Sequence, residues 1–250
     1  MKTKKVFFLW FTLFATCLQG SFAQEYKVYS ISSERLEVTK SLDDLADAEV
    51  FRIMEPYKKS VDSVMTPILG QSMVAMSVKR PESLLSNWAA DVMVEASTAT
   101  GLPKADMGLI NMGGLRNNMP EGIVRRGDII LISPFENSVC VLEMKGSDVE
   151  ELMRNIAAVH GEGVSKEVRL VISTDGQLRS ATISGQPIDH NRTYRIATLD
   201  YLAEGNDKMY ALKKHSKKYD MGMKAREAMM ESIIKNRNIN SRIEGRIVEE

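Results

Sequence analysis

Cysteine is scarce in this sequence, and its scarcity excludes two kinds of site. Two cysteines occur among 250 residues, Cys17 near the start and Cys140 in the body of the chain. A single cysteine in the body can form neither an internal disulfide nor a cysteine-ligated metal site. Cys140 lies in the apolar run from Val139 to Leu142, so we expect a buried thiol in the core rather than a nucleophile.

Histidine is also scarce, and the motifs of common catalytic centres are absent. The three histidines, His160, His190 and His215, do not occur in Asp-x-His, Gly-Asn-His or His-x-His arrangements. The sequence contains neither a Gly-x-Ser-x-Gly nucleophile turn nor a P-loop. We therefore predict no catalytic residue and no metal site in this chain, and we interpret the histidines as surface residues.

The apolar stretch nearest the N-terminus is too short to span a bilayer comfortably. It runs from Val6 to Cys17, the length of the apolar core of a signal peptide, and three of the first five residues are lysines. Small residues at Ser21 and Ala23 occupy the positions that signal peptidase reads. We predict a signal peptide at residues 1–23, cleaved after Ala23, and an exported chain, periplasmic or secreted, without a membrane span.

Two alternatives to a cleaved signal peptide remain. The segment could form an N-terminal strand or a membrane anchor. A lipoprotein would need its cut at Cys17, and the residues before Cys17, Phe-Ala-Thr, suit that processing poorly.

The chain lacks an excess of charge of either sign. Its 33 basic and 33 acidic residues balance, and the predicted leader holds three of the basic residues and none of the acidic ones. Cleavage leaves 30 basic residues against 33 acidic residues, a net charge of −3. This composition argues against binding of nucleic acid or of an anionic membrane as a property of the whole surface.

Apolar spacing and turn residues predict one domain, residues 24–250, with interleaved helices and strands. The predicted helices cover residues 41–64, 84–100, 147–159 and 221–235, and the predicted extended segments cover 68–79, 107–111, 129–132, 138–144, 168–174, 178–184, 193–199 and 242–248. Pro56 suggests a kink or break in the first helix, and Ser147 suggests the cap of the third. The hairpin around Gly176 argues against a purely parallel sheet. We predict an α+β fold, a mixed α/β sheet with helices.

Residues 110–128, INMGGLRNNMPEGIVRRGD, contain the first candidate binding motif. Gly113 and Gly114 permit unusual backbone angles and close approach of a ligand. Asn111 and Arg116 would lie near the end of a strand, and an arginine can bond two phosphate oxygens at once. The alternative is a glycine turn beside a solvated arginine.

Two further loops offer aromatic and acidic side chains. Phe135 lies in the loop SPFEN, as a core residue or as an exposed stacking surface. The segment 201–207, YLAEGND, supplies Tyr201, Gly205 and Asp207 directly after a strand. An aromatic ring and a carboxylate suit a base and the ribose hydroxyls. A turn with a capping aspartate is the alternative.

Taken in order, these motifs resemble the C-terminal, substrate-binding domain of the secreted 5′-nucleotidase family, which includes UDP-sugar hydrolases and 2′,3′-cyclic nucleotide phosphodiesterases. The resemblance covers roughly residues 45–248. INMGGLR is similar to the family's Asn-x-Gly-Gly-x-Arg, and SPFEN to its Pro-Phe-x-Asn. Residues 82–91 resemble its Glu-Ser-x-x-Gly-Asn…Ala-Asp helix entry, and residues 201–207 its aromatic-Leu-Ala-x-Gly-Gly-Asp segment.

The resemblance implies a 5′-nucleotidase C-terminal-domain-like fold and a role for each matched residue. Asn111 and Arg116 would contact the phosphate, Phe135 and Tyr201 would stack on the base, and Asp207 would bind the ribose. The loop glycines are Gly113, Gly114 and Gly205.

The sequence departs from the family pattern at two places. Pro81 stands where the family has a phosphate-binding arginine beside the Glu-Ser segment, with Arg80 one position earlier. In the third motif Asn206 replaces the second glycine, and Lys208-Met209 replaces a Gly-aromatic ending. The substrate preference of the family therefore does not carry over.

Hydrolysing members of the family carry an N-terminal metallophosphatase domain with two divalent metals, which activate water. The sequence of this chain predicts no such domain and no cofactor of its own. We expect the nucleotide-binding half of a 5′-nucleotidase-type phosphohydrolase in nucleotide catabolism, acting with a separate metallophosphatase chain and inactive alone. The alternatives are a stand-alone nucleoside- or nucleotide-binding protein and a degenerate, non-catalytic paralogue.

Overall fold

The structure is a computed structural model that describes residues 27–39, 42 and 47–250. The predicted signal peptide, its cleavage site and Cys17 lie outside the described residues, as do most residues of the predicted start of the first helix. The chain divides into two compact units, one ending at Phe51 and one from Arg52 to Glu250. In the first unit, residues 27–39 form neither helix nor strand.

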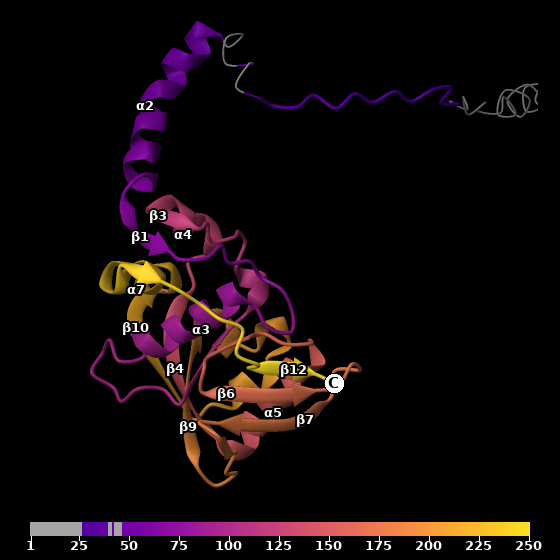
Figure 1. The fold of residues 1–250 in the computed structure, drawn as a ribbon, viewed down its shortest axis with the longest axis vertical. Coiled ribbons are helices and arrows are strands. Elements are labelled where there is room, and N and C mark those ends of the chain that lie inside the picture. Colours follow the sequence, from indigo (N-terminus) through magenta and orange to yellow (C-terminus); the bar gives the residue numbers. More distant parts are fainter. Residues whose placement is uncertain (1–26, 40–41, 43–46) are drawn as a thin grey trace, which may run out of the picture. The chain divides into compact units, whose positions relative to one another are not determined.

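The second unit contains three sheets. Their strands are β1 (Ile68–Ser72), β2 (Met107–Ile110), β3 (Gly122–Arg125), β4 (Ser138–Lys145), β5 (Gly163–Val164), β6 (Val168–Ile172), β7 (Leu178–Ile183), β8 (Gln186–Pro187), β9 (Thr193–Leu199), β10 (Lys217–Lys224), β11 (Asn238–Ile239) and β12 (Ile247–Glu249). The largest sheet has the order β10-β4-β9-β2-β5, and the others are β11-β1-β3 and β12-β6-β7-β8. Figure 1 shows β12, β6 and β7 side by side.

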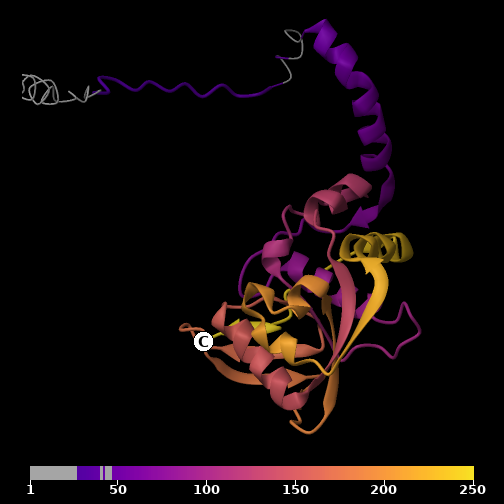
Figure 2. The ribbon, with the colours of Figure 1, turned by 180° about the vertical axis from the view of Figure 1, so that it is seen from behind.

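The α-helices among the described residues are α2 (Ala48–Met65), α3 (Leu84–Ala96), α4 (Arg126–Ile132), α5 (Gly146–Ala158), α6 (Asp200–Ala203) and α7 (Ala225–Asn236), and short 3₁₀ turns include η2 (Met112–Gly114), η3 (Asn206–Lys208) and η4 (Tyr210–Lys214). Helix α3 packs on β2 and β5 and contacts α7, whereas α5 packs on β6, β7 and β9. Figure 2 presents these helices from the opposite side.

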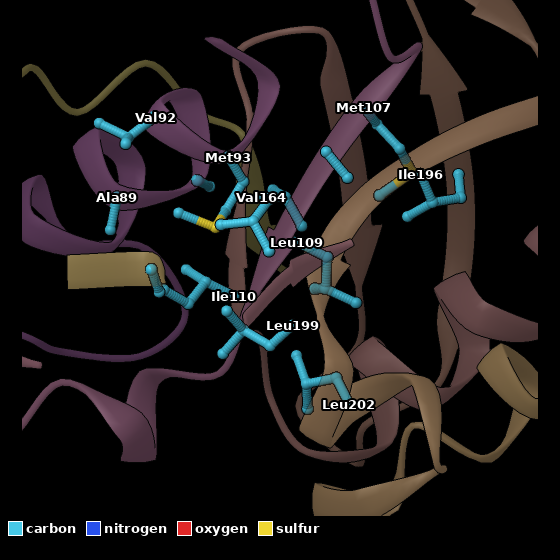
Figure 3. Packing of buried hydrophobic residues seen from close by; sticks show 14 of the residues in the cluster. Ala89, Val92, Met93, Met107, Leu109, Ile110, Val164, Ile196, Leu199 and Leu202 are labelled. Carbon is cyan, nitrogen blue, oxygen red and sulfur yellow. The ribbon is translucent and has the colours of Figure 1, made fainter. Parts of the chain in front are cut away.

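Apolar side chains of α3 and of the largest sheet pack against each other in the core. Figure 3 shows Ala89 and Met93 of α3 above Leu109 and Ile110 of β2, and all four side chains are buried. Burial of a large apolar side chain contributes about 1.5–3 kcal/mol. The mixed α+β fold predicted from the sequence is confirmed, because β9 pairs parallel with β2 but antiparallel with β4.

Most of the predicted elements are present, including the hairpin of β6 and β7. The prediction of a strand at residues 129–132 is wrong, because these residues end helix α4. Ile129 and Ile132 are buried while Leu131 is exposed, which is helical spacing that so short an apolar run does not reveal. Asp128 stabilises the first turn by accepting a hydrogen bond from the Arg125 N–H at 2.7 Å.

Several predicted boundaries are also wrong. Helix α2 is continuous through Pro56, so of the suggested kink or break the break does not occur. Helix α5 starts at Gly146, so Ser147 is not its cap. The predicted last helix begins at residue 225 instead of 221, because β10 pairs with β4 as far as Lys224. The terminal strand is β12 and covers only the end of the predicted segment.

Cys140 should remain unreactive toward thiol reagents until the chain unfolds. As predicted, its side chain is buried in the core. Burial raises the pKa of this thiol to about 12, and the thiolate is the reactive form. A Cys17→Ser variant treated with Ellman's reagent at about pH 8, near the ordinary pKa of a thiol, should release no chromophore in native buffer and one equivalent in guanidinium chloride. Rapid reaction of the native protein would contradict this prediction.

Candidate functional site

The three sequence motifs meet at one edge of the largest sheet. Strands β2 and β9 are parallel, so their carboxyl ends, followed by Asn111 and Asp200, lie at the same edge. Strand β4 begins at this edge because Val139 pairs antiparallel with Leu199. The Asp200 carboxylate accepts a hydrogen bond from the Ser138 N–H at 3.0 Å, which ties the two loops together. The topology therefore gathers segments that lie far apart in the sequence.

Asp207 joins two of the motifs by hydrogen bonds. Its Oδ2 accepts from Asn111 Nδ2 at 2.6 Å, and its Oδ1 accepts from the Tyr201 hydroxyl at 3.0 Å. The hydrogen bond to Asp207 raises the pKa of the Tyr201 hydroxyl. Asn111 is buried, and its Oδ1 accepts no hydrogen bond from any described residue. Predicted phosphate, base and ribose residues thus form one connected cluster.

The loop that carries Asp207 has an unusual backbone. Gly205 has a φ of +80°, and it is followed by two non-glycine residues with positive φ, Asp207 at +51° and Lys208 at +66°. Left-handed conformations of non-glycine residues are uncommon and gather at functional sites. The Asn206 side chain, which stands where the family has glycine, donates to the Tyr201 carbonyl at 2.8 Å and closes the loop.

The two glycines of the first motif have ordinary backbone angles but leave space around the turn. Neither Gly113 nor Gly114 has a positive φ, so the turn does not use the unusual backbone angles that these glycines permit, whereas the predicted close approach of a ligand stays a prediction. A Cβ at Gly114 would lie 2.8 Å from Asn111 Oδ1, whereas a Cβ at Gly113 would meet nothing within 4 Å. Gly114 therefore makes room for the Asn111 side chain, and Gly113 leaves open space beside the turn.

Arg116 is not part of the Asp207 cluster. Its side chain is exposed and donates from Nη1 to the Gly113 carbonyl at 3.2 Å. Its backbone N–H donates to the Ile132 carbonyl at 2.8 Å, which fixes the motif against the end of α4. Within the described part of the chain, no hydrogen bond or ion pair joins the Arg116 side chain to Asn111 or Asp207.

The two aromatic residues lie at the same sheet edge with exposed rings. Phe135 precedes β4 and is 47% exposed, and Tyr201 follows β9 and is 39% exposed. Phe135 is therefore not a core residue. Its loop is held by Arg226, whose guanidinium pairs with Glu136, and by Lys224 Nζ, which donates to the Glu136 carbonyl at 2.8 Å.

Sequence reasoning missed two residues of this site, Arg80 and Glu162. The Arg80 guanidinium donates from Nε to the Gly161 carbonyl at 2.9 Å and pairs with the Glu162 carboxylate. Glu162 is buried, and it also accepts a hydrogen bond from the Met112 N–H of the first motif. Arg80 was assigned no role from the sequence, because Pro81 separates it from the Glu-Ser segment beside which the family has its arginine. Glu162 carries no motif signal.

Burial raises the pKa of the Glu162 carboxyl above its ordinary value of 4.5, and the nearby charge of Asp207 acts in the same direction. The Met112 N–H and Arg80 partly offset this shift. A carboxyl group whose pKa is higher in the folded than in the unfolded chain stabilises the fold while it is protonated. This contribution to stability is complete below the unfolded pKa and is lost as the pH rises through the folded pKa.

An open depression of about 530 Å³ lies beside the cluster. Its lining includes Arg80, Gly113, Glu162, Asp207 and Lys208. Cationic and anionic side chains thus face one space, which suits a polar ligand that carries an anionic group. Among the described residues, no three histidine, cysteine, aspartate or glutamate side chains are grouped so that they could hold a metal ion.

The Glu82–Asp91 motif lies against the C-terminal segment, where it makes structural contacts. The Glu82 carboxylate accepts from Asn87 Nδ2 at 2.6 Å and from the backbone N–H groups of Glu244 and Arg246, each at 2.9 Å. Asp91 binds Arg246 with both oxygens, at 2.9 and 2.8 Å. The motif therefore fastens the segment before β12 to helix α3.

Comparison with known proteins matches residues 63–214 to a family described as "5'-nucleotidase, C-terminal domain". The protein called Protein UshA of Yersinia enterocolitica is 32% identical over 106 residues, which are 41% of this chain and 19% of that protein. Protein UshA of Escherichia coli is 23% identical over 180 residues, which are 70% of this chain and 32% of that protein.

The solved 5'-nucleotidase precursor of Thermus thermophilus has a similar fold. The TM-score is 0.71 at 23% identity, and the match covers 83% of this chain and 44% of that one. The chain thus spans less than half the length of each of these three proteins.

Proposed function

The chain belongs to the family of 5′-nucleotidase C-terminal domains, and on this basis we propose that it binds a nucleotide or nucleoside at the β2–β9 sheet edge. The observation that carries the proposal is the hydrogen-bonded cluster of Asn111, Tyr201 and Asp207. A carboxylate held by two neutral donors keeps free lone pairs for ribose hydroxyls. Exposed aromatic rings at the same edge supply stacking surfaces for the base.

The phosphate of the ligand would bind between the first motif and the depression. Both Arg116 and Arg80 are linked to the INMGGLR turn, since Arg116 bonds the Gly113 carbonyl and Arg80 shares Glu162 with Met112. A guanidinium fork suits phosphate oxygens. We assign Asn111, Gly113 and Gly114 to the same subsite.

Hydrolysis of the ligand would need a metal pair that the described residues do not fit. We propose that a separate metallophosphatase chain supplies it, while this chain orients the nucleotide, a contribution that can be a large part of the rate. When bound, two metals activate water and stabilise phosphoryl transfer.

Residues 24–250 would act as one exported binding domain. Among the described helices, none combines the length and the apolar character that crossing a bilayer requires.

Calorimetric titration with AMP, adenosine and UDP-glucose tests nucleotide binding. We expect a dissociation constant below about 1 mM for at least one ligand, which corresponds to about 4.1 kcal/mol, because two charge-assisted hydrogen bonds together contribute about 3–6 kcal/mol. Arg116→Ala should weaken AMP binding about tenfold, which corresponds to about 1.4 kcal/mol. Adenosine affinity should not change, because adenosine has no phosphate. Arg126→Ala is the control, because Arg126 is exposed on the adjacent helix. Affinities weaker than about 1 mM for all three ligands would refute the proposal.

A mixing experiment tests the separate partner. A suitable partner would be a secreted metallophosphatase, sought first in the reading frames that neighbour that of this chain. Adding this protein should raise the kcat/KM of the metallophosphatase for AMP hydrolysis, and the two chains should elute together on gel filtration. An unchanged kcat/KM together with separate elution would contradict the two-chain enzyme and leave the binding proposal standing.

A further inference from the structure

Glu162 connects the two segments that the proposed function assigns to phosphate binding. It directly precedes β5, whose Gly163 pairs with Ile110, the residue before Asn111. Its carboxylate accepts from the Met112 N–H with Oε2 and pairs with the Arg80 guanidinium through Oε1. The side chain is 3% exposed, whereas that of Arg80 is 42% exposed. One buried carboxylate therefore holds both the INMGGLR turn and a half-exposed arginine.

The contacts of Arg80 leave much of its guanidinium free for a ligand. Nε bonds the Gly161 carbonyl and Nη2 bonds Glu162. A guanidinium has five N–H donors, so three of them make no hydrogen bond within the described part of the chain. Because Arg80 lines the depression together with Gly113 and Asp207, these donors are available to an anion there.

Arg80 itself belongs to neither a helix nor a strand, since it lies in the loop between β1 and α3. An arginine on a loop loses side-chain entropy when it is fixed in one orientation. Glu162 and the Gly161 carbonyl fix that orientation before a ligand binds, which lowers the cost of binding. The same carboxylate fixes the first N–H of the η2 turn beside Asn111.

We infer that Glu162 is the positioning residue of the phosphate subsite: its carboxylate oxygens are taken up by Arg80 and the Met112 N–H, and through these bonds it orients Arg80 and the Met112–Gly114 turn toward the phosphate of a bound nucleotide. The inference rests on the proposed function. It predicts that Glu162 matters for nucleotides and not for nucleosides.

The test compares AMP with adenosine by calorimetry on the full chain. Glu162→Gln keeps the size of the side chain but removes one of its two acceptor oxygens and its charge. AMP affinity should fall about tenfold, the equivalent of one lost charge-assisted hydrogen bond, while adenosine affinity should stay within about twofold. Glu167→Gln is a matched control, because Glu167 is a partly buried carboxylate on the same segment that pairs with Lys104 outside the depression.

A double-mutant cycle separates positioning from a general structural role. Arg80→Ala should reproduce the AMP-specific loss, and adding Glu162→Gln to it should cost less than the single Glu162→Gln change, because the two residues act through one contact. Because Arg80 is half exposed, its variant should fold even if Glu162→Gln does not.

Three results would overturn the inference while leaving nucleotide binding in place. Glu162→Gln could weaken AMP and adenosine binding equally, or it could weaken neither. Arg80→Ala could leave the AMP affinity unchanged. Failure of the unmodified chain to bind AMP, adenosine and UDP-glucose would instead refute the proposed function, and the inference with it.

Discussion

Replacing Arg246 with alanine should lower the free energy of unfolding by about 3 kcal/mol, the lower end of the range for breaking a buried ion pair. Arg246 is 3% exposed. Its guanidinium bonds both oxygens of Asp91, the Glu244 carboxylate at 2.7 Å, and two backbone carbonyls. Removing it leaves two carboxylates without their cation, and both are partly exposed to water, which limits the loss.

Urea denaturation followed by circular dichroism measures this effect. Arg242→Ala is the control on the same segment, because the Arg242 side chain is exposed. The contact of Arg242 with helix α3 is made by its backbone carbonyl, which accepts a hydrogen bond from Asn87 Nδ2 at 2.9 Å. We expect its unfolding midpoint to stay near that of the unmodified chain, since exposed substitutions usually change stability by less than about 0.5 kcal/mol. Equal midpoints for the two variants would contradict a stabilising role of Arg246.

Replacing Asp207 with asparagine should weaken nucleoside and nucleotide binding by about 10- to 100-fold, the equivalent of about 1.5–3 kcal/mol for hydrogen bonds to a charged group. Asp207 is the acceptor for both Asn111 and Tyr201. An asparagine has one acceptor oxygen and an NH₂ group, so one of the two oxygens that now accept from Asn111 and Tyr201 becomes a donor, and ribose hydroxyls lose a charged acceptor. Unlike Glu162→Gln, this change should affect AMP and adenosine alike.

Calorimetry with both ligands is the measurement. Asp220→Asn is the control, because Asp220 is an exposed aspartate that accepts one backbone hydrogen bond, from the Gly222 N–H at 2.8 Å. A loss confined to AMP would place Asp207 at the phosphate instead of the ribose. Unchanged affinity for both ligands would remove Asp207 from the site.

The family resemblance could be read from the sequence because its motifs are local. INMGGLR, SPFEN and YLAEGND each follow or precede a strand whose apolar run is visible in the sequence. The order of these motifs then indicated a mixed fold with a ligand site at strand ends, and the fold and the family are confirmed. The strand predicted at residues 129–132 was wrong because so short an apolar run fits a helix or a strand equally well.

The sequence by itself therefore determined the family, the mixed α+β class and the motifs that hold Asn111, Tyr201 and Asp207. Only the tertiary structure decided which side chains meet. Strand pairing brought Asp207 to Asn111, placed Glu162 between Arg80 and Met112, and enclosed Arg246 between Asp91 and Glu244. Most of these contacts join residues that lie far apart in the sequence. No local periodicity encodes such pairs, because their geometry depends on the register of strands that pair across the whole chain.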